Sequence, residues 1–164
     1  MRVGIIADTH DNVDAIRAAT DLFAEEDVTE VIHCGDLIAP PVVDFFEGFA
    51  LHAVIGNNDG ELDGLDRAIR GLGAESALHG RFADLEFDGV RVAVLHGEDR
   101  DHVDEVAAGD YDVVCYGHHH ATERHDVGDT TVINPGAHFP TVPESERSVA
   151  ILDTGAGDVT FRDL

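Results

Sequence analysis

Apolar residues in the first third of the chain alternate between short continuous runs and segments with helical spacing. The continuous runs predict three buried strands, at residues 2–7, 30–34 and 51–55. The segments between and after them predict helices at residues 13–23, 40–46 and 63–72. Strands that alternate with helices are typical of parallel strands joined by helical crossovers.

The first two predicted helices have recognisable starts. In the first, one face holds Val13, Ile16, Thr20 and Phe23 at near-helical spacing. Asp11 or Asn12 could cap its N-terminus, because a short polar side chain there accepts a free backbone N–H. Pro40 and Pro41 open the second helix, where proline suits the first turn.

The second half of the chain is rich in predicted hairpins. Apolar runs flank Asp88-Gly89, Gly128-Asp129 and the segment 155–157, and these pairs predict strands at 83–87 and 90–95, 121–127 and 130–133, and 148–153 and 159–162. A further strand is expected at 111–116 and a short helix at 101–108. Crossovers followed by hairpins favour a mixed sheet, or two packed sheets with helices outside.

Acidic residues dominate the charge of the chain. Among its 164 residues are 34 Asp and Glu against 10 basic residues, all of them Arg, which gives a formal net charge of -24. Such a surface repels itself and repels nucleic acid in dilute salt, whereas a Debye length of about 3 Å at 1 M salt screens most of that repulsion. The balance resembles that of halophilic proteins, with an ordinary acidic protein as the alternative.

The remaining composition is that of a globular protein without membrane segments. Hydrophobic residues make up 43% of the chain, and no apolar run approaches the roughly 20 residues that span a bilayer. The N-terminus does not resemble a signal peptide, so we expect a cytoplasmic protein. Cys34 and Cys115 form no metal-binding or disulfide pattern, and we expect both to be packed in the core.

Five short polar clusters stand at or just after the ends of predicted strands. They are Asp8-Thr9-His10, Gly35-Asp36, Gly56-Asn57-Asn58-Asp59, His96-Gly97 and Gly117-His118-His119-His120. Loops at the carboxyl ends of strands converge at one edge of a sheet, so these groups are expected to meet there. Each cluster alone is typical of a turn, a cap or a solvated loop, and only the ordered set is specific.

The chemistry of this set fits a pair of divalent ions. Imidazole and carboxylate without thiolate suit Mn, Fe, Ni, Co or Zn, and one carboxylate can bridge two ions about 3.5 to 4 Å apart. Two ions so held polarise a phosphoryl oxygen and lower the pKa of a bound water. The pattern therefore favours hydrolysis of phosphate esters.

The ordered set resembles the calcineurin-like metallophosphoesterase superfamily, whose motifs run D-x-H, G-D, G-N-H-D/E, H and G-H-x-H. The short length and the loop Asn134-Pro135-Gly136 make the chain similar to the small single-domain phosphodiesterase branch. The resemblance implies one metallophosphoesterase domain over residues 1–164. It also implies an α/β fold, an αββα sandwich of two packed mixed sheets flanked by helices, with the dimetal site at the C-terminal ends of strands.

The resemblance also assigns roles by position. One ion would be held by Asp8, His10, Asp36 and His120, and the other by Asp36, Asn57, His96 and His118. Asp36 would be the bridge, and Asp59 would orient a neighbouring ligand or loop. The expected cofactors are two divalent ions, with Mn first and Ni, Fe, Co or Zn left open. A metal-bound water or hydroxide would attack a small phosphodiester or phosphomonoester substrate.

One residue departs from the general pattern of the superfamily. Asn58 stands where many members have a histidine that protonates the leaving group or stabilises charge, although members of the small branch often lack it. Asn58 can donate a hydrogen bond but cannot supply a proton at neutral pH. We expect Asp36, Asn57 and Asn58 to be the catalytic residues, with weak hydrolysis of poor leaving groups.

Residues beside the motifs have simpler interpretations. His119 is expected to face solvent, and the other histidines are expected at the surface or in packing. His138, just after the Asn-Pro-Gly loop, is the outside candidate for a substrate contact. Arg100 and Arg124 could meet phosphate, but solvated surface is the favoured interpretation.

Two alternatives to a phosphodiesterase stay open at this stage. The retromer subunit of the same superfamily uses this scaffold for protein contacts, but its metal site is compromised, whereas all seven ligand positions are intact here. A nuclease would be expected to have a basic patch, and the acidic charge argues against a nucleic-acid partner. The lack of a long apolar run argues against a membrane partner. A homodimer is left open.

The charge leads to a prediction about salt. Screening of self-repulsion should raise the thermal stability and the activity of the protein as KCl or NaCl rises from dilute buffer to about 1 M. Thermal unfolding followed by circular dichroism across this range measures the effect. Equal midpoints in dilute buffer and in molar salt would argue against a halophilic origin.

Overall fold

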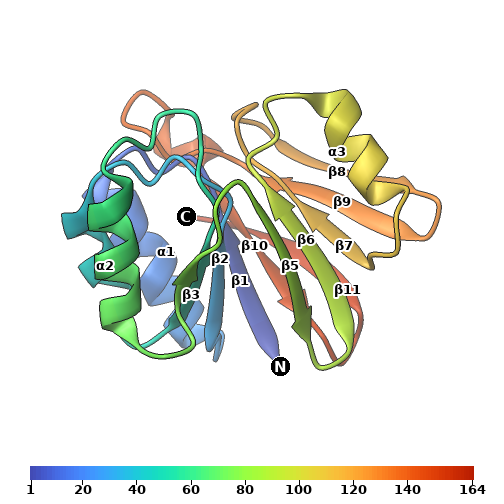
Figure 1. The fold of residues 1–164 in the computed structure, drawn as a ribbon, viewed down its shortest axis with the longest axis horizontal. Helices are drawn as coiled ribbons and strands as arrows, with labels where there is room; N and C mark the ends of the chain where they lie inside the picture. Colours follow the sequence, from blue (N-terminus) through green and yellow to red (C-terminus); the bar gives the residue numbers. More distant parts are fainter.

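The computed structural model describes residues 1–164, the side chain of Ser145 excepted, as two packed sheets (Figure 1). The first sheet has the strand order β11-β10-β1-β2-β3-β4 and the second has the order β5-β6-β7-β9-β8. The first comprises β1 (Arg2–Ile6), β2 (Glu30–His33), β3 (Ala50–Ala53), β4 (Ala77–Leu78), β10 (Ser148–Asp153) and β11 (Asp158–Asp163). The second comprises β5 (Phe82–Phe87), β6 (Val90–Leu95), β7 (Val113–Cys115), β8 (Thr122–Val127) and β9 (Thr130–Pro135).

Helices cover the outer face of each sheet. Against the first sheet lie α1 (Val13–Glu25), α2 (Leu62–Leu72) and the 3-10 helix η1 (Pro40–Phe46), and against the second lies α3 (Arg100–Ala107). A second 3-10 helix, η2 (Glu144–Glu146), precedes β10. The predicted αββα sandwich of two mixed sheets is confirmed.

The core consists of three apolar layers that follow from this arrangement. Side chains such as Ile5, Ile32 and Val94 pack between the two sheets. Phe23 and Phe46 pack with the outer face of the first sheet, where α1, α2 and η1 cover it. Each central strand is buried on both faces, which explains why β1 and β2 are continuous apolar runs rather than alternating ones.

Most predicted elements are present within one or two residues of their predicted ends. Asn12 is the cap of α1, since its side-chain oxygen accepts the backbone N–H of Ala15 at 3.3 Å. The helix after Pro40 and Pro41 is of the 3-10 type. Strand β4 was not predicted: it pairs with β3 through only two residues, too few to produce a periodic pattern.

The topology brings the ends of five strands to one edge of the sandwich. Strands β1, β2 and β3 are parallel neighbours in the first sheet, and β6 and β7 are parallel neighbours in the second. The loop that follows each of these strands contains one of the five polar clusters. The sandwich therefore gathers the clusters at the seam between the two sheets, as the strand pattern predicted.

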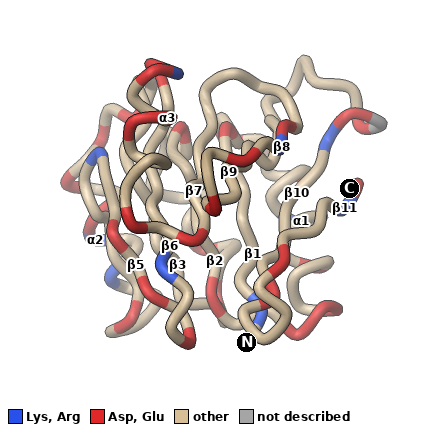
Figure 2. The backbone as a smooth tube through the Cα atoms, turned by 90° about the vertical axis from the view of Figure 1, so that its right-hand side faces the viewer, with Lys and Arg blue, Asp and Glu red and all other residues tan. Residues whose placement is uncertain are grey.

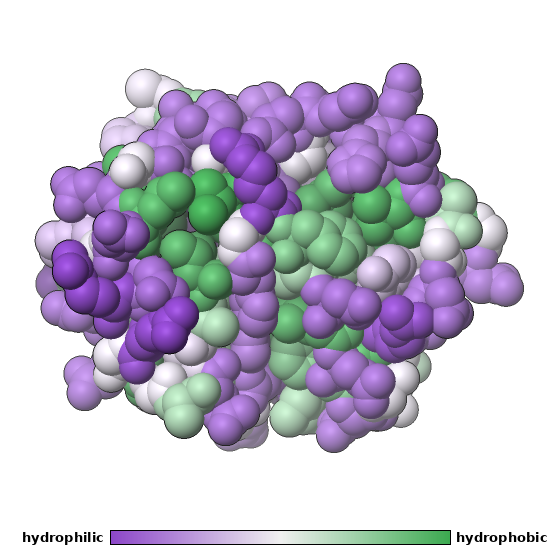
Figure 3. All heavy atoms as spheres, in the orientation of Figure 1, coloured by the Kyte–Doolittle hydropathy of each residue, from purple (hydrophilic) through white to green (hydrophobic). Residues whose placement is uncertain are grey.

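The surface is acidic over the whole fold. Asp and Glu are spread over helices, loops and several strands, and they far outnumber Arg (Figure 2). Hydrophilic residues cover most of the face shown in Figure 3 and divide its apolar residues into separate patches. Among the described residues, no helix is both long and apolar enough to span a membrane.

Candidate metal centre

The loops that form the site are built from backbone conformations that most residues avoid. Asp8, His10, Asp36, His118 and His120 all have positive φ, between 44° and 65°. A non-glycine residue in this region adds strain of about 1 to 3 kcal/mol and persists only where its surroundings determine it. Five of the seven candidate ligands are therefore held by local geometry rather than by a regular element.

Glycines allow these loops to approach one another closely. A Cβ added to Gly117 would lie 2.6 Å from Asp8 Oδ2, and one added to Gly56 would collide with Asp36. The Gly-Asn and Gly-His motifs therefore need glycine at these positions because the facing carboxylates occupy the space of a side chain.

Two buried carboxylates and a buried imidazole form the floor of the site. Asp8, Asp36 and His96 are each at most 1% exposed, and one ligand atom from each lies within 4.8 Å of the others. His96 Nε2 lies 3.5 Å from Asp36 Oδ2. His96 Nδ1 donates to the carbonyl oxygen of Cys34 at 2.8 Å, which directs Nε2 toward the site.

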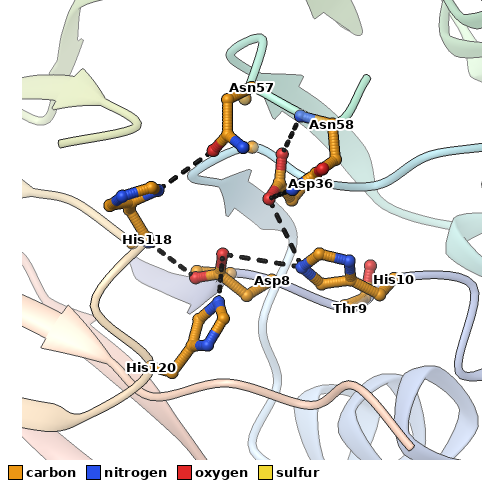
Figure 4. A network of polar contacts seen from close by, with 12 residues as sticks. Asp8, Thr9, His10, Asp36, Asn57, Asn58, His118 and His120 are labelled. Atoms are coloured by element: carbon orange, nitrogen blue, oxygen red, sulfur yellow. Dashed lines mark hydrogen bonds and ion pairs between the residues drawn. The ribbon is translucent and has the colours of Figure 1, made fainter. Parts of the chain in front are cut away.

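The other candidate ligands surround this floor in two groups (Figure 4). His10 and His120 lie beside Asp8, with Nε2 atoms 4.0 Å and 3.4 Å from Asp8 Oδ1. On the other side, Asn57 Oδ1 lies 2.9 Å from His96 Nε2 and 3.0 Å from His118 Nδ1. The structure thus brings all seven predicted ligand residues together.

Asp36 lies between the two groups. Its Oδ2 is 3.3 Å from His10 Nε2, and both its oxygens accept from Asn58, Oδ1 from the backbone N–H at 2.8 Å and Oδ2 from the side-chain amide at 2.7 Å. Burial alone would raise the pKa of Asp36, but the contacts with His10, His96 and Asn58 lower it well below its usual range. Asp36 is therefore ionised and touches both groups, as a bridging ligand requires.

The electrostatics of the site favour added positive charge. Burial raises the pKa of Asp8 to about 7, even though His96 and the backbone N–H of His118 oppose the shift. Burial would lower the pKa of His96, but Asp36 and the Cys34 carbonyl raise it to about 9. The buried carboxylates Asp8 and Asp36 thus favour a bound proton at the site, and they attract a metal cation for the same reason.

Unpaired buried atoms show that the site fits a metal ion. Asp8 Oδ1 and His10 Nε2 are both buried and have no hydrogen-bond partner. Buried polar atoms are nearly always paired, so two such ligand atoms 4.0 Å apart, without partners among the described residues, fit a site for a cation. Oxygen and imidazole donors suit a divalent transition metal.

Residues outside the predicted ligand set hold the ligand loops in place. Asp59 accepts the backbone N–H groups of Asp36, Gly56 and Ile38 at 2.8 to 3.0 Å, which agrees with its predicted orienting role. Asn134 donates to the carbonyl oxygen of Gly117 at 2.9 Å and so supports the triple-histidine loop. The sequence analysis singled out the loop Asn134-Pro135-Gly136, but the contact of Asn134 with Gly117 could not be predicted from sequence.

His33 is a second hidden support. It is fully buried, its Nδ1 accepts the N–H of Gly35, and its Nε2 therefore donates to Thr9 Oγ1 at 3.0 Å. This pair of bonds joins the loop after β1 to the loop after β2. Sequence indicated packing for His33, and only the spatial neighbours reveal its connecting role.

The structure confirms packing for His138, rules out its alternative role in a substrate contact, and corrects the prediction for His119. His138 is 0% exposed, and its Nδ1 donates to the carbonyl oxygen of Ala7 at 2.9 Å, so it supports the site from below and cannot touch substrate. His119 is half-buried, with its ring against Tyr116 at a centroid distance of 6.1 Å, rather than facing solvent. The loop turns sharply there, which an extended-chain argument does not anticipate.

The two arginines near the motif loops pair with carboxylates. Arg100 donates to Glu123 at 3.1 Å, and Arg124 donates to Asp158 at 3.2 Å and to the carbonyl oxygen of Val159 at 2.7 Å. Both contacts support the surface interpretation over a phosphate contact.

Comparison with known proteins gives a consistent family. The chain matches the model of the calcineurin-like phosphoesterase superfamily domain over residues 1–157. It is 36% identical to a phosphodiesterase of Methanocaldococcus jannaschii over 160 residues, which cover 94% of this chain and 93% of that protein.

Solved structures extend the comparison to the fold. The structure of an archaeal phosphodiesterase superposes with a TM-score of 0.92 at 34% identity, covering 100% of both chains. Vps29 of Chaetomium thermophilum superposes with a TM-score of 0.71 at 18% identity, covering 99% of this chain and 96% of that one. The second likeness is one of fold alone.

The buried His33 predicts a dependence of stability on pH. Burial lowers its pKa from 6.5 to about 3, so between these pH values the unfolded chain binds a proton here that the folded chain does not. Stability should therefore fall as pH falls from 6.5. As pH falls through this range, the free energy of unfolding should decrease more steeply in native protein than in His33→Gln, by up to about 1.4 kcal/mol per pH unit. Urea unfolding in molar salt with a chelator measures this difference.

A surface histidine provides the control for this measurement. His125→Gln, at a 45% exposed histidine on β8, is the control for replacing a histidine by glutamine outside the core. Identical pH dependence in native protein and in His33→Gln would show that His33 is not buried as a neutral group.

Proposed function

Because the chain belongs to the calcineurin-like phosphoesterase superfamily, we propose that it is a phosphodiesterase that depends on two divalent metal ions. The family implies divalent ions and a phosphoester substrate. The observation that supports a dinuclear centre best is Asp36, an ionised buried carboxylate in contact with both groups of candidate ligands. The phosphodiesterase of Methanocaldococcus jannaschii supports a diester as the substrate class.

The proposed ligand sets follow the two groups around Asp36. Asp8, His10, Asp36 and His120 would hold one ion, and Asp36, Asn57, His96 and His118 would hold the other. When bound, such a pair supplies a Lewis acid for the phosphoryl oxygen and lowers the pKa of water. We place Mn first among the metals, with Ni, Fe, Co or Zn as alternatives, because imidazole and carboxylate donors suit all of them.

Asn58 has a positioning role in this proposal. Its amide donates to Asp36 Oδ2 at 2.7 Å while its backbone N–H donates to Oδ1. The residue thereby fixes both oxygens of the proposed bridge. Since an amide cannot release a proton at neutral pH, it leaves the departing oxygen without an acid at this position.

A protein-interaction scaffold related to the retromer subunit is the weaker alternative. The Vps29 structure of Chaetomium thermophilum is a more distant relative than the phosphodiesterase, at 18% identity, and shares the fold alone. The complete set of candidate ligands and the orphaned atoms of Asp8 and His10 favour catalysis.

Further features of the proposal come from composition and from the family. We propose a cytoplasmic location. Adaptation to high salt would account for the net charge and for the absence of Lys. A small phosphodiester is the proposed substrate, and a phosphomonoester is the alternative. A homodimer is part of the hypothesis.

The proposed bridge predicts a metal stoichiometry. Native protein loaded with Mn should hold about two ions per chain by elemental analysis after gel filtration. Asp36→Asn should lose both ions because it removes the shared carboxylate. His96→Ala should mainly weaken the binding of one ion, because His96 belongs to only one of the two proposed ligand sets.

Matched surface substitutions separate ligand loss from general damage. Asp110→Asn and His102→Ala change residues that are 99% and 59% exposed, and both should keep the native stoichiometry. Native protein that never holds more than one ion, with all seven ligands intact, would refute the dinuclear centre.

The position of Asn58 predicts how the rate depends on the leaving group. General acid help is worth about 10²- to 10⁴-fold, so native protein should favour aryl phosphodiesters and lag on alkyl ones. Asn58→His should raise the rate on poor leaving groups more than on good ones. Log rate plotted against leaving-group pKa should be steep for native protein and shallower for the variant.

Asn58→Gln keeps an amide and serves as the control for side-chain size, with a slope expected to stay steep. A shallow native slope, with chemistry shown to be rate-limiting, would mean that another group supplies the proton. His119, half-buried beside the ligand loop, would then be the first residue to test.

A further inference from the structure

Phe139 lies against one side of the candidate metal centre and has no part in holding it. Its ring centroid is 4.6 Å from that of His120 and 5.5 Å from that of His10. Both histidines belong to the Asp8 group of candidate ligands. The ring is partly exposed, and Phe139 belongs to none of the three core layers, so it presents an aromatic surface at the site.

The residue before it fixes the position of this ring. His138 is fully buried, and its backbone N–H and its Nδ1 donate to the carbonyl oxygens of Asp8 and Ala7 at 3.0 and 2.9 Å. Its own carbonyl oxygen accepts from Asn12 at 2.5 Å. Three bonds thus tie the start of the Phe139 loop to the loop that contains Asp8 and His10. A group held in place before binding loses little conformational entropy when a ligand packs against it.

Phe139 and Asn58 lie by different parts of the centre. Asn58 bonds Asp36, and Figure 4 shows it with Asn57 on the side away from His120. The rings that Phe139 touches are those of His10 and His120. A phosphodiester has two ester groups, so a phosphate over the centre can direct one of them toward Asn58 and the other toward Phe139.

We propose that Phe139 is a specificity-determining residue that binds a planar aromatic group, an aryl ring or a nucleobase, on the retained side of a phosphodiester. The inference rests on the proposed function. Aromatic pairs prefer tilted or edge-to-face contact and add about 0.5 to 1.5 kcal/mol beyond burial, which corresponds to a discrimination of about 2- to 12-fold. A substrate with an alkyl group in this place gains no such contact.

Two substrates with the same leaving group test the inference. Phenyl p-nitrophenyl phosphate and methyl p-nitrophenyl phosphate both release p-nitrophenolate, so they differ only in the retained group. The ratio of their kcat/KM values should fall about 3- to 10-fold in Phe139→Leu and should be retained in Phe139→Trp. Phe49→Leu, a change at a partly buried phenylalanine just before β3, at the opposite end of that strand from its ligand loop, should keep the native ratio.

Metal content distinguishes substrate binding from mere support of the ligand rings. Phe139→Leu loaded with Mn should hold as many ions as native protein. If the ratio is unchanged in Phe139→Leu, or if the variant loses metal, Phe139 only packs against His10 and His120 and the inference is wrong.

A binding measurement on the native protein needs no variant. Calorimetry should show that the Mn-loaded protein binds phenylphosphonate about 3- to 10-fold more tightly than methylphosphonate. Equal affinities would overturn the inference even if every variant failed to fold. Hydrolysis without an aryl preference would refute this inference alone, whereas no hydrolysis of either diester would refute the proposed function.

Discussion

The buried carboxylates Asp8 and Asp36 impose the constraint on which the rest of the site depends. Two such groups close together repel each other and are poorly solvated, so the fold must surround them with donors or cations. Asp36 receives two hydrogen bonds from Asn58 and lies near two imidazoles, and its pKa is lowered. Asp8 receives the backbone N–H of His118 on one oxygen only, and its pKa is raised. This difference leaves Asp8 with an unsatisfied oxygen, which a cation satisfies.

The strained loops follow from the same constraint. A carboxylate can point into a narrow seam between two sheets only if the chain turns sharply after each strand, and positive φ at Asp8, Asp36 and His118 provides those turns. Hydrogen bonds made by residues outside the candidate ligand set, such as Asp59 and Asn134, offset this strain. The supports are therefore as necessary to the geometry as the ligands are.

The sequence predicted the elements and the grouping of the candidate ligands better than it predicted these supports. Strands such as β1 are long enough and apolar enough to be recognised, and an ordered set of motifs marks each ligand by its place after a strand. The supports have no such pattern. Asn134 donates to Gly117 and His138 donates to Ala7, residues that are distant in sequence. The sequence alone does not distinguish a buried histidine from an exposed one. The predicted surface position of His119 was wrong because the loop conformation, with positive φ on either side, is set by contacts in space.

The charge of the whole protein also bears on the substrate. With a net charge of -24 and no Lys, the surface repels anions, and Arg100 and Arg124, the arginines that follow motif loops, are paired with Glu123 and Asp158. Under the proposed function, attraction for a phosphate would therefore come from metal ions at the centre rather than from the surface. A phosphodiester has one negative charge, whereas a phosphomonoester has close to two at neutral pH, so the monoester meets about twice the repulsion on approach. Molar salt screens that repulsion for both, and the proposed contact with Phe139 is made by a retained ester group, which only the diester has. Electrostatics and shape thus both favour the diester.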